Sequence, residues 1–249
     1  MHMNHIVIPS DHPRAHSLHI REMLVNGFRR ELVVPEGLIA HGRGEAYDYL
    51  LGERTTKTAQ HAIKAAAAIL LLSNRPVISV NGNTAALCPN AVVELAKVAG
   101  VTLEVNIFYR TKERESAIKA ELELKGAKKV LGVGSKASAT IPELQSERRR
   151  VDPNGIYAAD TVLVPLEDGD RTEALVKMGK TVITIDLNPL SRTSRAANII
   201  IVDNVVRAMP ALVEAAHKLR GTKSLRKIVD DFNNIKNLRE SLRIIKGEV

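Results

Sequence analysis

Short apolar runs recur along the chain, and most are followed by polar residues and then by an amphipathic stretch. Such runs lie at 77–80, 101–107, 129–132, 161–164, 182–185 and 199–202. Apolar runs of this length, bounded by turn residues, are typical of buried strands. Their alternation with helical patterns predicts six βα-like units and a largely parallel sheet.

The region before the first apolar run has a helical pattern. Ile20, Leu24 and Phe28 recur every fourth residue, which predicts a helix over about 11–32 with Asp11 as its N-cap. Residues 35–37 (PEG) predict a turn, a helix is expected over 46–51, and Thr55 and Thr56 cap a long helix that reaches residue 72.

We therefore predict a single α/β domain over 1–249, with a doubly wound, mostly parallel (Rossmann-like) sheet. A helical N-terminal part covers 11–75, the core covers 76–220, and a C-terminal helix covers 222–246. In that last helix apolar residues repeat every three or four positions. This seam packs either on its own domain or against a second copy in a homodimer, and the two interpretations weigh equally.

Composition narrows the class of protein. Of 249 residues, 45% are hydrophobic and 26% are charged, which indicates a globular chain. The longest strongly apolar run, 65–72, is too short for a membrane span, and the N-terminus has no signal-peptide pattern. A lone cysteine, Cys88, suits a reducing cytoplasm, so we expect a cytoplasmic protein without a membrane partner.

The formal charge of +8 permits two interpretations, a nucleic-acid-binding protein or a site for a polyanionic small molecule. Only 3% of residues are aromatic and none is Trp, which argues against base-stacking surfaces. The small-anion interpretation is stronger, and no nucleic-acid partner is expected.

The stretch 181–209 (TVITIDLNPLSRTSRAANIIIVDNVVRAM) carries the strongest chemical signal. Two apolar runs each end in polar residues, and ligands of open α/β sheets bind outside the carboxyl ends of the strands. An acid there, Asp186, suits ribose hydroxyls, and Arg192 suits phosphate as a planar fork of donors. The stretch therefore predicts a nucleotide site without a glycine-rich fingerprint.

Further candidate ligands precede and follow that stretch. Arg14, Ser17 and Arg21 share one helix face, which is either solvated or a phosphate clamp, and Arg43 lies between two glycines in what we expect to be a loop. Two other polar clusters follow strands: an Asn-Gly-Asn loop with Asn81 and Asn83, and an acidic loop with Glu167, Asp168 and Asp170, which is either a polar turn capped by Asp170 or a Mg²⁺ or ammonium site. An irregular insertion is expected over 133–157, and its arginine run, Arg148, Arg149 and Arg150, is interpreted as solvated surface.

Four long blocks carry a family resemblance: LIAHGRGEAYDYLLGERTT at 38–56, PVISVNGN at 76–83, VPLEDGDRTEALVKMGK at 164–180 and TIDLNPLSR at 184–192. They resemble archaeal phosphopantothenate synthetase (4-phosphopantoate–β-alanine ligase) from about residue 12 to residue 219. The resemblance implies an ATP-dependent, AMP-forming ligase of coenzyme A biosynthesis that joins 4-phosphopantoate and β-alanine through an acyl-adenylate, with Mg²⁺.

The resemblance also implies site residues. Those expected to bind ATP are Arg21, Arg43, Asp186, Leu187, Asn188, Arg192, Thr193, Asn204 and Val205. For phosphopantoate we expect Asn81, Asn83 and Arg110, and for the β-alanine ammonium, Mg²⁺ or both we expect Glu45, Asp168 and Asp170. Two other functions remain open: a ligase on the same scaffold for another carboxylate, and a basic, non-catalytic nucleic-acid-binding protein.

Overall fold

The core of the molecule is a six-stranded sheet. The computed structural model describes residues 9–166 and 168–248. The strands are β1 (Pro76–Val80), β2 (Thr102–Val105), β3 (Val130–Leu131), β6 (Thr161–Val164), β7 (Thr181–Ile185) and β8 (Ile199–Ile201). They lie in the order β3-β2-β1-β6-β7-β8 and all five pairings are parallel. The predicted doubly wound, Rossmann-like sheet is therefore confirmed, and the strand order reverses between β1 and β6.

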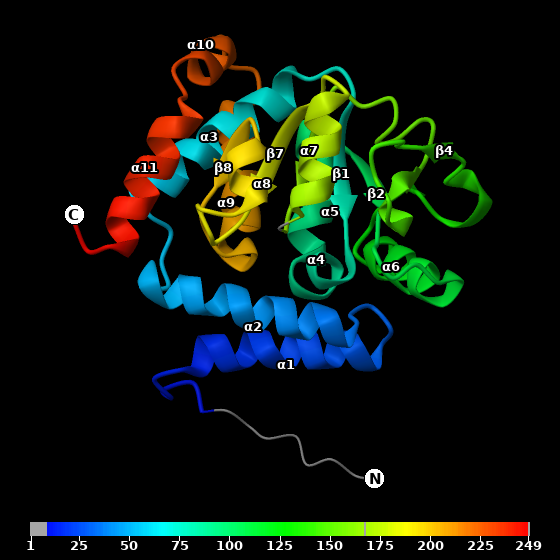
Figure 1. Cartoon of the computed structure of the whole chain (residues 1–249), viewed down its shortest axis with the longest axis horizontal. Helices are drawn as coiled ribbons and strands as arrows, with labels where there is room; N and C mark the ends of the chain where they lie inside the picture. Colours follow the sequence, from blue (N-terminus) through cyan, green and yellow to red (C-terminus); the bar gives the residue numbers. More distant parts are fainter. Residues whose placement is uncertain (1–8, 167, 249) are drawn as a thin grey trace.

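Helices cover both faces of this sheet (Figure 1). Ile78, Leu163 and Ile183 point to a face packed by α3 (Lys57–Leu72), α5 (Pro89–Ala99), α6 (Lys112–Leu124) and α9 (Val205–Leu219). Val77 and Val162, one residue out of step, point to the other face, under α7 (Gly169–Lys177) and the segment 139–159. Successive side chains of a strand alternate between faces, so the continuous apolar runs are those of strands buried on both sides.

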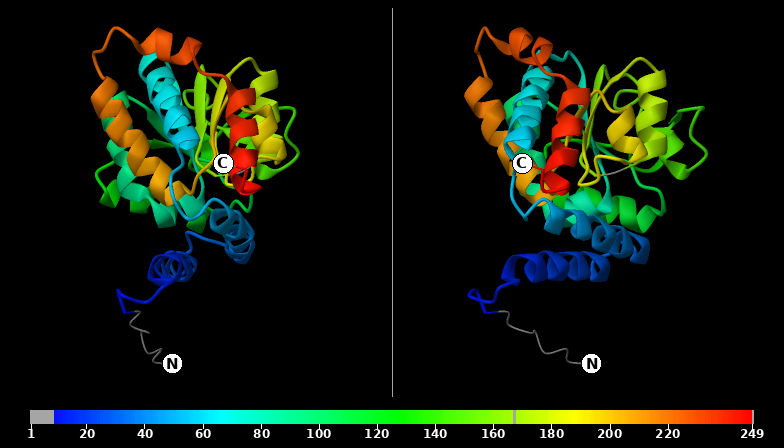
Figure 2. Two further views of the ribbon diagram at one scale, coloured as in Figure 1. Left: turned by 90° about the vertical axis from the view of Figure 1, so that its left-hand side faces the viewer. Right: turned by 60° about the vertical axis from the view of Figure 1, so that its left-hand side comes forward.

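The N-terminal part forms a hairpin of two helices, α1 (Ala15–Arg29) and α2 (Pro35–Leu50). In both views of Figure 2 the hairpin lies below the sheet, beside the short helix α4 (Gly82–Leu87) that follows β1. Because α4 leaves the carboxyl end of β1, the hairpin covers the carboxyl edge of the sheet.

Three predictions about this hairpin are wrong. Residues 35–37 do not form a separate turn between elements; they are the first residues of α2. Pro35 is favourable there because the first N–H of a helix has no partner within the helix. Gly42, Arg43 and Gly44 are not a loop but lie in the middle of α2. Tertiary contacts outweigh the low helix propensity of glycine here. The first helix also begins later than expected, with Arg14 rather than Asp11 at its N-cap position.

The predicted single C-terminal helix is likewise two helices, α10 (Leu225–Asp230) and α11 (Asn234–Ile245). Asn233 interrupts the pattern because its side chain accepts a hydrogen bond from the Lys236 N–H and starts α11 as an N-cap. Leu225, Ile228 and Phe232 pack on the main core, and Leu238 packs on a cluster of Leu51, Ile200 and Val202. The seam is thus packed on its own domain.

The segment after β3 contains two 3₁₀ turns, η1 (Gly134–Lys136) and η2 (Glu147–Arg149), and a small antiparallel pair, β4 (Ala139–Thr140) with β5 (Arg150–Val151). The remaining helix, α8 (Arg192–Ala196), follows β7. Within the described ranges, no helix is long and apolar enough to cross a membrane.

Candidate active site

One face of α2 runs along the carboxyl ends of three strands, β1, β7 and β8. Gly37 accepts a hydrogen bond from the Asn83 Nδ2, after β1, at 2.9 Å. A Cβ on Gly44 would lie 3.7 Å from the Leu187 Cδ1, after β7. Asp48 accepts from the Asn204 Nδ2, after β8, at 2.8 Å. Positions 37, 41, 44 and 48 share one helix face, so His41 lies on the side of α2 that faces the strand ends.

Asp186 organises the loop after β7. Its Oδ1 accepts the Asn188 N–H at 2.9 Å, and its Oδ2 accepts from the hydroxyls of Ser191 and Ser194. The Asn188 Oδ1 in turn accepts the Leu190 N–H, so this amide also shapes the loop. A nearly buried carboxylate at a strand end, 9% exposed, is thus held in one orientation by its own loop.

Asn204 and Asp48 fasten α2 to the end of β8. Asn204 is the N-cap of α9, where its Oδ1 accepts the Val206 N–H, and Val205 is the first, buried residue of that helix. Arg207 donates to both oxygens of Asp48, at 3.1 and 2.5 Å, and to Asp203. These contacts join α2 to a segment about 150 residues further along the chain.

Arg21 on α1 is bound to Glu45 on α2. Its Nε and Nη2 donate to the Glu45 Oε2 at 3.1 and 2.7 Å, and Tyr49 donates to the Oε1 at 2.9 Å. Burial alone would raise the pKa of Glu45, but these hydrogen bonds and the charge of Arg21 together lower it. Burial lowers the pKa of the neighbouring His41, so its imidazole is neutral at pH 7.

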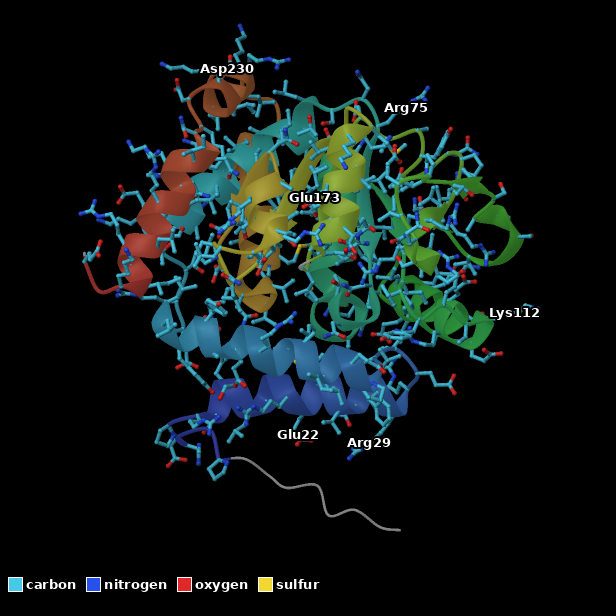
Figure 3. All side chains as sticks on the ribbon, viewed as in Figure 1. Glu22, Arg29, Arg75, Lys112, Glu173 and Asp230 are labelled. Atoms are coloured by element: carbon cyan, nitrogen blue, oxygen red, sulfur yellow. The ribbon has the colours of Figure 1, made fainter. Side chains whose placement is uncertain are left out.

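Arg192, at the start of α8, is held by two carboxylates of α7. It forms ion pairs with Asp170 at 2.7 Å and with Glu173, labelled in Figure 3, at 2.8 Å. The Arg192 and Asp170 side chains are 64% and 69% exposed. Both are therefore accessible to a ligand, which would compete with the present partners.

Arginines also gather where the strand order reverses. Arg171 is fully buried, and its Nη1 donates to the Ser79 Oγ at 2.6 Å and the Asn106 Oδ1 at 3.0 Å. Asp168 caps α7 by accepting the Arg171 N–H and forms ion pairs with Arg148 and, at 3.6 Å, with Arg171. Sequence reasoning missed both arginines: Arg148 is not on a solvated surface, since its side chain is only 13% exposed.

The acidic loop is therefore partly different from what we expected. Its helix cap is Asp168, not Asp170, and the Asp168 oxygens already have cationic partners. Glu167 lies outside the described residues.

The three expected phosphopantoate ligands have structural partners. Asn81 is the N-cap of α4, and Asn83 joins α4 to α2. Arg110 is buried in an ion pair with Glu115 at 2.6 Å and donates to the Gly132 and Arg150 carbonyls. Its charge is therefore neutralised by Glu115 at the edge of the sheet. A charged residue after a strand does not reveal from sequence which way it points.

The remaining residues expected to bind ATP lie on α2 or in the segment after β7. Leu187 packs beside Leu51 and Ile200, and Thr193 is buried in the first turn of α8. Arg43 is on α2, next to the glycine that faces Leu187.

For a divalent cation, the described residues contain no group of three or more His, Cys, Asp or Glu that could enclose it. Mg²⁺ usually takes one or two carboxylates together with nucleotide phosphates. The exposed Asp170 fits such a partial set of ligands, whereas Asp168 does not, because its oxygens are bound to arginines.

Comparisons with known proteins point to one family. The family model described as phosphopantothenate/pantothenate synthetase matches residues 58–248. A protein of Thermococcus kodakarensis named 4-phosphopantoate–β-alanine ligase is 52% identical over 244 residues, which cover 97% of this chain and 93% of that protein. Proteins with the same name from Thermococcus onnurineus and Methanosarcina mazei are each 51% identical over 98% and 96% of this chain, and over 94% of their own lengths.

Proposed function

This chain belongs to the phosphopantothenate/pantothenate synthetase family, and we infer that it is an ATP-dependent ligase that joins 4-phosphopantoate to β-alanine. The product is 4′-phosphopantothenate, a precursor of coenzyme A. The observation that supports this most directly is the identity of about half of the residues over nearly the whole chain with relatives that carry that name.

We propose that the reaction passes through an acyl-adenylate. A carboxylate oxygen of 4-phosphopantoate attacks the α-phosphorus of ATP, and the bond from that phosphorus to the bridging oxygen breaks to release diphosphate. The amine of β-alanine then attacks the acyl carbon, AMP leaves with its oxygen, and the ammonium proton passes to a base. Neither step needs a protein nucleophile; both need charge neutralisation and positioning.

The proposed ATP site spans the ends of β7 and β8 and the facing side of the helical hairpin. Asp186 accepts hydrogen bonds from ribose hydroxyls, Asn188 and Asn204 face the sugar or base, and Arg21, Arg43 and Arg192 meet phosphates. Leu187, Thr193 and Val205 supply the remaining apolar and backbone contacts. Support comes from α2, which contacts both strand-end loops through Gly44 and Asp48.

For the acidic residues we propose narrower roles than those expected from the sequence. Asp170 would hold Mg²⁺ that is bound to the ATP phosphates, where the cation neutralises phosphate charge. Glu45 would meet the β-alanine ammonium or hold Arg21 in place. For Asp168 we retain no cation ligation, because Arg148 and Arg171 neutralise its charge.

The test of function is incubation of the purified chain with 4-phosphopantoate, β-alanine and MgATP. We expect equimolar AMP and 4′-phosphopantothenate, detected by mass spectrometry, and far less product when pantoate replaces its phosphate ester. ADP as the nucleotide product would contradict the adenylate route, and equal use of another carboxylate would contradict the substrate.

The ATP site is tested by Arg192→Gln, with Arg195→Gln as the matched control on the same short helix. Loss of a charged hydrogen bond to phosphate costs about 1.5–3 kcal/mol, so we expect the KM for ATP to rise roughly 10- to 100-fold for Arg192→Gln. The exposed Arg195 should change it less than about threefold. Equal KM values for the two variants would remove Arg192 from the site.

Assembly and location are also proposals. A homodimer is supported by exposed apolar residues on the hairpin, among them Ile39 and Leu50, and light scattering tests it. A cytoplasmic location is supported by the lone, buried Cys88, and cell fractionation tests it.

A further inference from the structure

Three arginines converge at the point where the strand order reverses. Arg171 comes from the start of α7, Arg148 from the segment that precedes β5, and Arg114 from the first turn of α6. Burial lowers the pKa of Arg171 and that of Arg114, and in each case the like charge of Arg148 lowers it further. Arg171 remains charged at neutral pH, since burial lowers its pKa only to about 9.

This cluster has more positive charge than its contacts neutralise. Within the described ranges, Asp168 is the one carboxylate that forms an ion pair with any of the three. Arg114 instead donates to the carbonyls of Leu32 and Tyr109, and the charge of Glu36 acts on it without an ion pair. Glu104 also acts on Arg171, but its pKa is raised to about 7 by burial, so it carries only part of a charge at neutral pH.

The unused donors point to an anion. Arg171 is fully buried, yet its Nε and Nη2 donate no hydrogen bond to any described residue. The Nη1 is fixed by Ser79 and Asn106, so the opposite edge of the guanidinium, the fork that binds carboxylate and phosphate, faces Asp168. A buried arginine N–H without an acceptor destabilises the fold, unless a ligand accepts its hydrogen bond.

We propose that Arg171, Arg148 and Arg114 bind the phosphate group of the acid substrate, apart from the site of the ATP phosphates. This assignment rests on the proposed function for the identity of the substrate, but not for the anion site itself. A phosphate monoester carries about −1.5 to −2 charge at pH 7, which matches the excess of positive charge. The ends of β1 and β6, at the switch point, are where doubly wound sheets bind ligands.

In the ligand-free protein, the Asp168 carboxylate occupies the position proposed for that phosphate. Its carboxylate bridges Arg148 and Arg171 and is 14% exposed. The incoming phosphate takes over these two guanidiniums, while Asp168 keeps its second contact, the cap of α7. The acid's carboxylate then points along the strand ends toward β7, where the α-phosphate of ATP is proposed to lie.

The first test is Arg148→Gln, with Arg150→Gln as the matched control. Arg150 is two residues away, 44% exposed and paired with Glu147. We expect Arg148→Gln to raise the KM for 4-phosphopantoate roughly 10- to 100-fold, with KM for ATP within about threefold of wild type. The preference for 4-phosphopantoate over pantoate should fall by the same factor, because pantoate has no phosphate to lose contact with. A purely structural role of Arg148 would change both KM values together and would overturn the inference.

The second test does not need the reaction. Calorimetric titration of the full chain with inorganic phosphate should show binding that Arg148→Gln weakens at least about tenfold and Arg150→Gln leaves unchanged. Asp168→Asn keeps a helix cap but removes the competing charge, so it should tighten phosphate binding by roughly three- to tenfold.

These outcomes separate the two proposals. A wild-type chain that forms no product but binds phosphate through Arg148 would refute the proposed function and retain the anion site. A wild-type chain that binds no inorganic phosphate, or an Arg148→Gln variant that binds it as tightly, would overturn the inference whatever the chain catalyses.

Discussion

Glu104 shows how one buried residue fixes a loop beside the site. It lies on β2, and its two oxygens accept the N–H groups of Asp152 and Ile156 at 2.9 and 2.6 Å. A Cβ on Gly155 would lie 1.9 Å from one of these oxygens, so only glycine fits there. Glu104 therefore holds the segment that carries Arg148 against the sheet.

Burial raises the pKa of Glu104 and the two hydrogen bonds lower it. The effect of burial is the larger, so the pKa is raised to about 7. The folded state then binds a proton that the unfolded state releases at about pH 4.5, so stability from this group is present below pH 4.5 and is lost as the pH rises through 7. At about 1.4 kcal/mol per pKa unit, we expect a loss of about 3 kcal/mol across that range.

Urea unfolding at several pH values would measure this loss, with Glu104→Gln as the reference that cannot titrate. The difference in unfolding free energy between the two proteins should fall steadily between pH 4.5 and pH 7. A constant difference would mean that Glu104 keeps an ordinary pKa.

Among single residues, His41 is the candidate for the base that accepts the proton of the β-alanine ammonium. It shares the face of α2 that runs over the strand ends, and burial lowers its pKa. Its neutral imidazole therefore persists to lower pH than that of an ordinary histidine, whose pKa is about 6.5, and can accept the proton of the β-alanine ammonium.

We expect His41→Gln to lower kcat roughly 100-fold and to abolish an acid limb of the kcat profile centred below pH 6.5. His19→Gln, on the exposed side of α1, is the matched control and should leave both unchanged. An acid limb that survives in His41→Gln would assign it to another group.

At the scale of elements, a glycine of the hairpin has room for a side chain, whereas a glycine of α4 has none. A Cβ on Gly42, in the middle of α2, would have nothing within 4 Å, whereas a Cβ on Gly82 would lie 1.9 Å from the Leu32 carbonyl oxygen. The first glycine only weakens a helix, and the second lets α4 approach the α1–α2 connection.

We expect Gly42→Ala to stabilise the fold by up to about 1 kcal/mol and Gly82→Ala to destabilise it by several kcal/mol, on the order of 3 or more. Thermal unfolding of the two variants measures both signs. A Gly82→Ala protein as stable as wild type would show that the hairpin does not sit against α4.

At the scale of the whole molecule, the C-terminal helices belong to the fold. The Asn237 Nδ2 donates to the Ile200 carbonyl and the Asn234 Oδ1 accepts the Ile200 N–H, so α11 binds the backbone of the edge strand β8. Leu238 and Ile244 cover Ile200 and Val202 next to the proposed ATP site.

We therefore expect truncation after residue 220 to lower the thermal midpoint by roughly 5–10 °C or more, because it exposes an apolar cluster and an edge strand. Calorimetry measures the midpoint, and removal of 247–249 alone is the control. An unchanged midpoint in the longer truncation, with altered assembly, would instead indicate that α11 serves the dimer.

The sequence by itself determined the strands, their parallel sheet and the family, because buried strands and long blocks of identical residues leave a local pattern. An acid and an arginine after an apolar run are also visible locally, and on them rests the proposal of a nucleotide site in the loop after β7. Only the tertiary structure decided that Gly42–Gly44 is helical, that Arg110 is neutralised by Glu115, and that Arg148 turns inward to Asp168 and Arg171. Those facts depend on contacts between distant segments, and neither periodicity nor charge along the chain encodes which way a long polar side chain points.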